Sequence, residues 1–145
     1  MTFKVATSIK YGNYKHLQTA TNNVIKLINS HWSRLKENID FNEDVCFLIR
    51  PIKGTTKGIA FSKSNRIEID PRYHSLEILE TIAHELVHSE QYKQNRLVFD
   101  TTNRSWVWSN TSYRTATSFR QYYNFPWEVE ARERATAYIN KYCPV

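Results

Sequence analysis

Two histidines and a glutamate near the middle of the chain have the spacing of a metal site. His84, Glu85 and His88 make up the pattern H-E-x-x-H. On a helix, residues four apart lie on the same side one turn apart, so both imidazoles can bind one zinc ion while the carboxylate lies beside it. An ion held in this way can activate a water molecule for hydrolysis. Because three fixed positions also arise by chance, the surrounding sequence has to support this interpretation.

The residues around the motif recur at helical spacing, and we expect a helix from Ser75 to about Tyr92. Ser75 is a suitable N-cap, and Glu77 places a carboxylate in the first turn, where it suits the helix dipole. The apolar residues of this helix fall on one arc: Leu79, Ile82, Ala83, Leu86 and Val87. The motif residues share the adjacent arc. One arc is therefore predicted to pack against the core and the other to bind metal.

A catalytic zinc ion normally has three protein ligands and keeps its fourth position for water, so a third ligand is needed. We expect a second helix from Pro126 to about Lys141, because proline suits the first turn of a helix. Glu128 falls on the inward-facing stripe of this helix, whereas Glu130 is rotated about 200 degrees away and can pair with Arg134 on the surface. A buried carboxylate is costly unless it is paired or bound to metal. Glu128 is therefore the predicted third ligand.

The other periodic segments predict the elements that must hold these two helices. Apolar residues recur at helical spacing between about residues 14 and 37, which indicates a packing helix. Residues 45–50 form a strand-like run, and residues 59–61 and 67–69 alternate in the manner of a hairpin with one buried face. The sequence therefore predicts an α+β domain.

The composition is that of one folded domain spanning residues 1–145. Hydrophobic residues make up 41% of the chain and charged residues 23%, and no segment reaches the apolar length needed to span a bilayer. The first ten residues contain no apolar stretch like a signal-peptide core, so we expect a cytoplasmic protein. Cys46 and Cys143 are too few for a disulfide framework, and we expect two free thiols, with Cys46 in the core.

Positive charge and aromatic rings are concentrated in residues 96–120. The chain has 20 Lys and Arg against 14 Asp and Glu, for a net charge of +6, which favours nucleic acid or an acidic protein surface as a partner. In this segment the basic and aromatic residues are Arg96, Arg104, Arg114 and Arg120 with Trp106, Trp108, Tyr113 and Phe119. Such a segment can bind single-stranded nucleic acid by stacking and phosphate contacts. It would also serve a peptide cleft or an ordinary hairpin, so all three interpretations stay open.

The H-E-x-x-H motif and the downstream sequence P-W-E-V-E-A at residues 126–131 resemble the zincin metallopeptidases of the SprT-like and phage-type groups. The resemblance covers about residues 59–142, including an aromatic hairpin at residues 106–113. It implies a zincin-like minimal metallopeptidase domain with an N-terminal packing helix, a small and mostly antiparallel sheet, and a C-terminal helix that carries a glutamate. In these families a glutamate three residues before an alanine is the third ligand, which falls on Glu128 and Ala131.

Two features depart from the family pattern. Arg132 stands where many relatives have an aspartate, which weakens any assignment of a supporting residue there. The cysteine ribbon of longer SprT-like proteins is absent, so their usual DNA-contact module is not expected. A phage-type protein of this kind would act in the cytoplasm of the host.

Motif and resemblance together predict a zinc-dependent peptidase that acts on a peptide or protein. A Zn²⁺ ion held by His84, His88 and Glu128 would activate water, with Glu85 as general base. An extended peptide would lie along a free edge of a strand at residues 66–70. Substrate contacts are expected from Trp106, Trp108, Tyr113 and Tyr123. For the donor to the oxyanion the sequence does not choose among Tyr113, Tyr122, Tyr123, His74 and Arg132.

Two other functions remain open from the sequence. One is a DNA-associated zinc protein, including a DNA-linked protease, that uses residues 96–120. The other is a catalytically silent interaction protein on the same fold, because a fold does not guarantee an activity. Glu85 argues against a purely structural metal site, since such sites usually have four protein ligands and need no base. No membrane partner is expected, and the sequence leaves the oligomeric state open.

Overall fold

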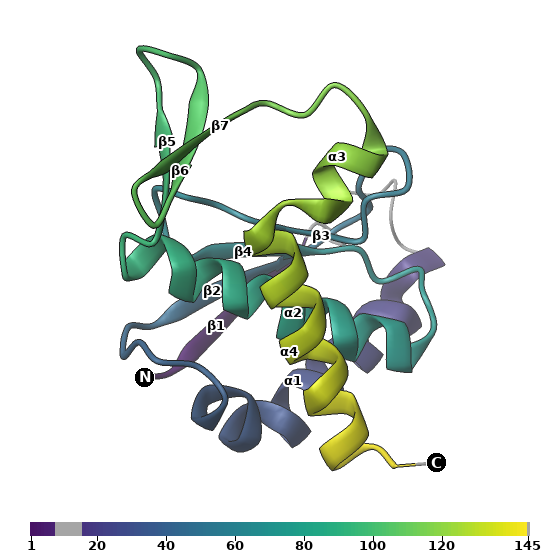
Figure 1. Cartoon of the computed structure of the whole chain (residues 1–145). Coiled ribbons are helices and arrows are strands. Elements are labelled where there is room, and N and C mark those ends of the chain that lie inside the picture. The colour runs from purple at the N-terminus through teal and green to yellow at the C-terminus, as the bar shows by residue number, and fades with distance from the viewer. Residues whose placement is uncertain (8–15, 145) are drawn as a thin grey trace.

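Figure 1 shows the computed structural model of the chain, which describes residues 1–7 and 16–144. In chain order its elements are β1 (Phe3–Thr7), α1 (Gln18–Glu37), β2 (Val45–Ile49), β3 (Gly58–Ala60), β4 (Arg66–Ile69), α2 (Ser75–Lys93), β5 (Leu97–Asp100), β6 (Ser105–Trp108), β7 (Thr111–Arg114), α3 (Phe119–Asn124) and α4 (Pro126–Tyr142). The predicted α+β class is confirmed. The first helix is also confirmed, although its predicted start near residue 14 lies outside the described residues. None of the helices in the described parts combines the length and apolar character needed to cross a membrane.

The main sheet has four strands in the order β1-β2-β4-β3. Strand β2 runs parallel to both β1 and β4, and only β3 and β4 pair antiparallel. The predicted hairpin is therefore confirmed, but the prediction of a mostly antiparallel sheet is wrong. The connection through α1 explains the parallel pairing of β1 with β2, because a helical crossover returns the chain so that the next strand runs in the same direction as the first. Strand β4 is parallel to β2 because the chain first forms the outer strand β3 and then turns back to pair between β3 and β2.

The order of the strands also corrects the predicted free edge. Strand β4 lies inside the sheet between β2 and β3, so its backbone is paired on both sides. Among the described strands, the outer one on this side is β3, which pairs with β4 alone. Strand β3 also contacts α2, so the exposed edge of the sheet runs beside the helix that carries the H-E-x-x-H motif.

The hydrophobic core lies between the main sheet and the helices. On β2, Val45, Phe47 and Ile49 face this core, together with residues of α1, β4, α2 and α4. Cys46 lies between two of these residues and is exposed, so the prediction of a core cysteine is wrong. The alternation of a strand sends successive side chains to opposite faces, and Cys46 falls on the face that points away from the helices.

Helix α2 is the most enclosed of the helices, and its predicted apolar arc is confirmed. All five residues of that arc are buried: Leu79, Ile82, Ala83, Leu86 and Val87. The predicted N-cap is wrong by one residue, because Ser75 is already helical and the side chain of His74 accepts the cap hydrogen bond from the Leu76 backbone N–H at 3.3 Å. Helix α2 contacts α1, α4, β3 and β4, and thus connects the sheet to the other long helices.

Helix α4 packs directly against α2 (Figure 1). Ala131 and Ala135 lie fully buried on its inner face, and small side chains at such positions allow two helices to approach closely. Further along, the hydroxyl of Tyr138 is 2.8 Å from Nδ1 of His31 on α1. The first turns of α4 are thereby brought beside the middle of α2.

The strands β5, β6 and β7 form a second sheet in that order. A buried carboxylate joins α2 and α4 to the residue just before the first strand of this sheet. Glu90 on α2 is 3% exposed, and its oxygens accept hydrogen bonds from Arg134 of α4, from Arg96 just before β5, and from the backbone N–H of Asp40. Arg96 and Arg134 both also contact Glu130. Two guanidinium groups and two carboxylates therefore form one network, which satisfies the buried charge.

We expect Glu90→Gln to lower the free energy of unfolding by about 3 kcal/mol at pH 7, because two guanidinium groups lose a buried charged partner. Urea denaturation measures the change. The matched control is Glu37→Gln at the exposed end of α1, which should change stability by less than about 0.5 kcal/mol. Equal small effects in both variants would show that the network contributes little.

The stabilities of the wild type and of Glu90→Gln should depend differently on pH. Burial alone would raise the pKa of Glu90, but the hydrogen bonds from Arg134 and from the Asp40 backbone hold it below its ordinary value of 4.5. A carboxylate with a lowered folded pKa contributes stability that is fully present above the unfolded pKa and is lost as the pH falls through the folded pKa. The difference in stability between wild type and Glu90→Gln should therefore shrink below about pH 4.5. A difference that stays constant down to pH 3 would contradict this assignment.

Candidate metal centre

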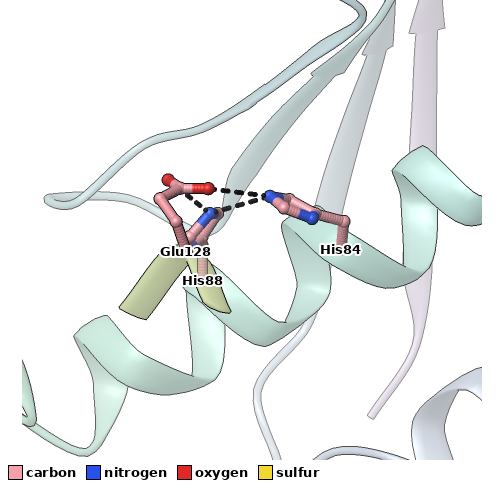
Figure 2. Close-up of side chains that lie close together, drawn as sticks. All are labelled: His84, His88 and Glu128. Carbon is pink, nitrogen blue, oxygen red and sulfur yellow. Dashed lines mark hydrogen bonds and ion pairs between the residues drawn. The ribbon is translucent and has the colours of Figure 1, made fainter. Parts of the chain in front are cut away.

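Three side chains predicted from the sequence as metal ligands meet between α2 and α4 (Figure 2). Nε2 of His84 lies 3.1 Å from Nε2 of His88 and 3.2 Å from Oε2 of Glu128. Nε2 of His88 lies 3.1 Å from Oε1 of Glu128. The ligand atoms of the three side chains all lie within 4.8 Å of one another. In residues 1–7 and 16–144, no other group of three or more histidine, cysteine or acidic side chains is placed to hold a metal ion.

The helical phase of α4 explains why Glu128 reaches the histidines. Pro126 starts the helix, and two residues later Glu128 points inward on the same side as Ala131 and Ala135. Its side chain is nearly buried, with 5% of the residue exposed. Glu130 does not join the histidines, but the prediction of a surface residue paired with Arg134 is wrong, because its side chain is only 27% exposed and accepts hydrogen bonds from Arg96 and Gln91. Arg96 binds it at 2.8 and 2.9 Å, whereas the predicted contact with Arg134 is longer, at 3.5 Å.

The charges of the three groups are strongly coupled. Burial would raise the pKa of Glu128, but the hydrogen bonds from His84 and His88 outweigh it and hold that pKa far below its ordinary value. Burial would lower the pKa of His88, yet its bond to Glu128 and the negative charges of Glu85 and Glu128 raise it to about 9. The negative groups around His88 therefore favour a positive charge at this position, which either a proton or a metal ion can supply.

The donor set fits a divalent cation such as zinc. Two imidazole nitrogens and one carboxylate oxygen converge on one point from two rigid helices, and zinc commonly binds nitrogen and oxygen donors of these kinds. Glu128 is buried and ionised, and a group of this kind is costly to keep inside a protein without a cation beside it. Three protein ligands also leave a coordination position open, which distinguishes catalytic zinc sites from closed structural ones.

Gln91 supports the centre and was missed in the sequence. Its side chain is fully buried, and Oε1 lies 2.8 Å from Nδ1 of His88. Its amide nitrogen donates to the backbone oxygen of Trp127 at 3.0 Å and to Oε1 of Glu130 at 3.3 Å. Because both donor contacts go to α4, the oxygen of the amide must face His88.

This orientation decides how His88 is protonated. An amide oxygen can only accept, so Nδ1 of His88 must be the donor, and the neutral ring then has a free electron pair on Nε2, where the other ligands meet. The position of Gln91 three residues after His88, on the same side of α2, is a signal that sequence reasoning could have used. The missing information was the location of α4, which supplies both acceptors.

Glu85 lies between the two histidines, beside strand β3. It is 8% exposed, and it accepts a hydrogen bond from the backbone N–H of Ala60. Burial raises the pKa of Glu85, and the charge of Glu128 acts in the same direction, against the opposing effect of the histidines. Strand β3 comes this close because residue 58 is glycine, where a Cβ atom would lie 2.6 Å from Thr81 Cγ2 and 3.1 Å from Glu85 Cγ.

Two hollows adjoin the centre. One, of about 390 Å³, is lined by His84, Glu85 and Tyr122, among others, and extends along α2. The other, of about 240 Å³, is lined by His88, Glu128 and Trp106, among others. Both the base and the ligands therefore face open space that a substrate can enter.

Of the five proposed oxyanion donors, Tyr122 is the one that borders both hollows. Partial desolvation and the negative charge of Glu128, to which its hydroxyl donates a hydrogen bond, raise the pKa of Tyr122, so the hydroxyl keeps its proton at neutral pH. The other four residues have partners elsewhere: His74 caps α2, Arg132 stacks on Tyr123 at 3.5 Å, and Tyr113 contacts Phe125 and Trp127. Of the five residues, Tyr122 is thus the one that borders both hollows, with its hydroxyl held by Glu128.

The four residues predicted to contact substrate lie in different places relative to the two hollows. Trp106 borders the smaller hollow. The rings of Trp108 and Tyr113 pack against that of Trp127, at centroid distances of 6.2 and 5.3 Å from it. Neither residue lines either hollow. Tyr123 faces a shallow groove beside α4. Phe119, which sequence reasoning assigned only to the basic segment, lines the larger hollow.

The basic and aromatic segment is partly used by the fold. Arg96 is bound to Glu90 and Glu130, and its guanidinium lies over the ring of Trp108 at 5.3 Å. Arg104, Arg114 and Arg120 are exposed. The nucleic-acid interpretation therefore depends on these three side chains and not on the aromatic rings packed around Trp127.

Comparisons with protein-family models, curated proteins and solved structures find no match to this chain. The residues of the site are therefore the features that bear on its function.

We expect Gln91→Leu to weaken zinc binding about 10- to 100-fold, because His88 loses the acceptor that orients its ring. Competition with a fluorescent zinc chelator measures the affinity. Ser89→Ala is the matched control, since Ser89 lies two residues away on α2 and its hydroxyl is buried without a hydrogen-bond partner among the described residues. If both variants bind zinc equally well, Gln91 does not position His88.

Proposed function

We propose that this protein is a zinc-dependent peptidase. The observation that carries the proposal is the convergence of His84, His88 and Glu128, with Glu85 beside them at the wall of an open hollow. A hydrolytic zinc site needs this combination of three ligands, an open position and a base. The resemblance of the two motifs to zincin metallopeptidases supports the same reading, because two ligands come from α2 and the third from α4.

A zinc ion held by these three residues would supply Lewis acidity, which lowers the pKa of water and polarises a carbonyl group. The protein itself has to move the protons. Glu85 accepts a proton from the attacking water and then delivers it to the amine that leaves. Its raised pKa suits the first step, since the carboxylate binds the proton more readily than an ordinary glutamate does.

Two further groups assist this chemistry. The hydroxyl of Tyr122 borders the hollow, keeps its proton and donates a hydrogen bond to Glu128. Rotation of this hydroxyl away from Glu128 would let it donate to the oxygen that becomes negative when the carbonyl is attacked. Gln91 acts indirectly by holding the ring of His88. These roles require no movement of α2 or α4, which are fixed by the buried contacts between them.

The edge of β3 supports a peptide as the substrate. Its three residues pair with β4 on one side only, and their contact with α2 brings them next to Glu85. An extended peptide can add to such an edge by backbone hydrogen bonds, which gives affinity without reading the sequence. A scissile bond in that strand would pass close to the general base.

Glu85→Gln is expected to keep its zinc and to lose at least about 100-fold in kcat/KM, because the amide cannot accept the proton of the attacking water. Cleavage of a fluorescence-quenched peptide library by the zinc-loaded protein provides the assay, with metal content measured on the same samples. Glu37→Gln is the matched control and should cleave like the wild type. Undiminished cleavage by Glu85→Gln would remove Glu85 from the mechanism, and a zinc-loaded wild type that cleaves no peptide would favour a silent binding protein.

A further inference from the structure

The larger hollow continues from the metal centre along α2 towards its first turns. Its floor is formed by α2, with Glu80 one turn before His84. Opposite lie Lys57 just before β3, Gly58 at the start of β3, and Phe119 and Tyr122 from α3. A side chain of a residue next to the bond being cleaved would therefore enter this hollow.

The wall contributed by α3 is aromatic and largely uncovered. Phe119 is 75% exposed, and its ring contacts those of Tyr122 and Tyr123 at 6.4 and 5.8 Å between centroids. No residue of α3 is buried. A phenylalanine this exposed gains free energy when an apolar or planar group covers it. The wall is thus suited to contact a long side chain.

The charges on the floor do not cancel. Nζ of Lys57 pairs with Oε2 of Glu77 at 2.9 Å, so these two charges neutralise each other. Glu80 is exposed, and Lys57 also attracts it at longer range, but within residues 1–7 and 16–144 no side chain forms a hydrogen bond or ion pair with its carboxylate. One negative charge therefore remains unpaired in this hollow, although the whole chain carries +6.

We propose that this hollow receives an arginine or lysine side chain of the peptide substrate. The inference rests on the peptidase function proposed above and names its preferred residue. The cationic head meets Glu80, while the rest of the side chain lies against Phe119 and Tyr122. Arginine is favoured over lysine, because a guanidinium group can stack on an aromatic ring and bind a carboxylate through two hydrogen bonds at once.

Other side chains fit the hollow less well. An acidic side chain would be repelled by Glu80, and the one cation nearby, Lys57, is already paired with Glu77. An uncharged apolar side chain would cover Phe119 but would also remove water from the carboxylate of Glu80 without replacing its hydrogen bonds. A side chain with an apolar stem and a cationic head can cover Phe119 and also pair with Glu80.

The test uses fluorescence-quenched peptides of one common sequence that differ at a single position, which holds arginine, lysine, norleucine or glutamate. Zinc-loaded wild type should cleave the arginine peptide about tenfold better than the norleucine peptide, and the glutamate peptide least. In Glu80→Gln the preference for arginine over norleucine should fall to about twofold or less, and in Glu80→Lys the glutamate peptide should overtake the arginine peptide. Phe119→Ala should also reduce cleavage of the arginine peptide. The control Glu37→Gln should leave the order of the four peptides unchanged.

Binding provides a second measurement that does not depend on turnover. The affinities of the same peptides for zinc-loaded Glu85→Gln should follow the same order, and the preference for arginine should decrease as salt is added. If peptides are cleaved but the preference is absent, or persists in Glu80→Gln, the inference about the basic side chain is wrong and the peptidase function stands. If no peptide is cleaved by the wild type or bound by Glu85→Gln, the proposed function fails, and this inference fails with it.

Discussion

The close packing of α4 against α2 is the constraint on which the rest of the structure depends. Each helix carries polar groups into this buried contact, and every one of them requires a partner from the other helix or from nearby loops. Glu128 meets the histidines, Gln91 binds the Trp127 backbone and Glu130, and Glu90 binds Arg134. The alanines of α4 permit the approach. The interface therefore fixes the helices and the metal ligands with the same contacts.

The two sides of the site differ in how firmly they are held. The ligands and Glu85 lie on long helices whose inner faces are buried, so their geometry is set by the core. The opposite wall is α3, a short helix with exposed aromatic rings and no buried residue. Segments with few buried contacts open at low cost in free energy, whereas a metal site requires ligands in fixed positions. This division would suit the proposed peptidase, because the metal ligands stay fixed while the aromatic wall can adapt to the bound peptide.

Helical periodicity accounts for what the sequence could predict. It placed Glu128 beside the histidines and Glu130 away from them, and it identified the buried arc of α2, because these assignments depend only on local geometry. The half-buried position of Glu130 was missed, because it depends on Arg96 and Gln91 from other elements. The parallel strands, the exposed face of Cys46 and the inner position of β4 depend on how distant segments pair, which an apolar run cannot reveal. Gln91 and Tyr122 acquire their roles from neighbours on other elements, so their residue types alone carried little information.

The most direct test of the account is the zinc content of the purified protein and of three variants, measured by mass spectrometry after dialysis against excess zinc and then against metal-free buffer. We expect about one zinc ion per wild-type chain, a loss of most of it in His84→Ala and in Glu128→Ala, and retention in Glu130→Gln, whose amide can still accept from Gln91. Loss of zinc in Glu130→Gln with retention in Glu128→Ala would contradict the proposed ligand set. Zinc binding unaffected by all three substitutions would show that the metal lies elsewhere.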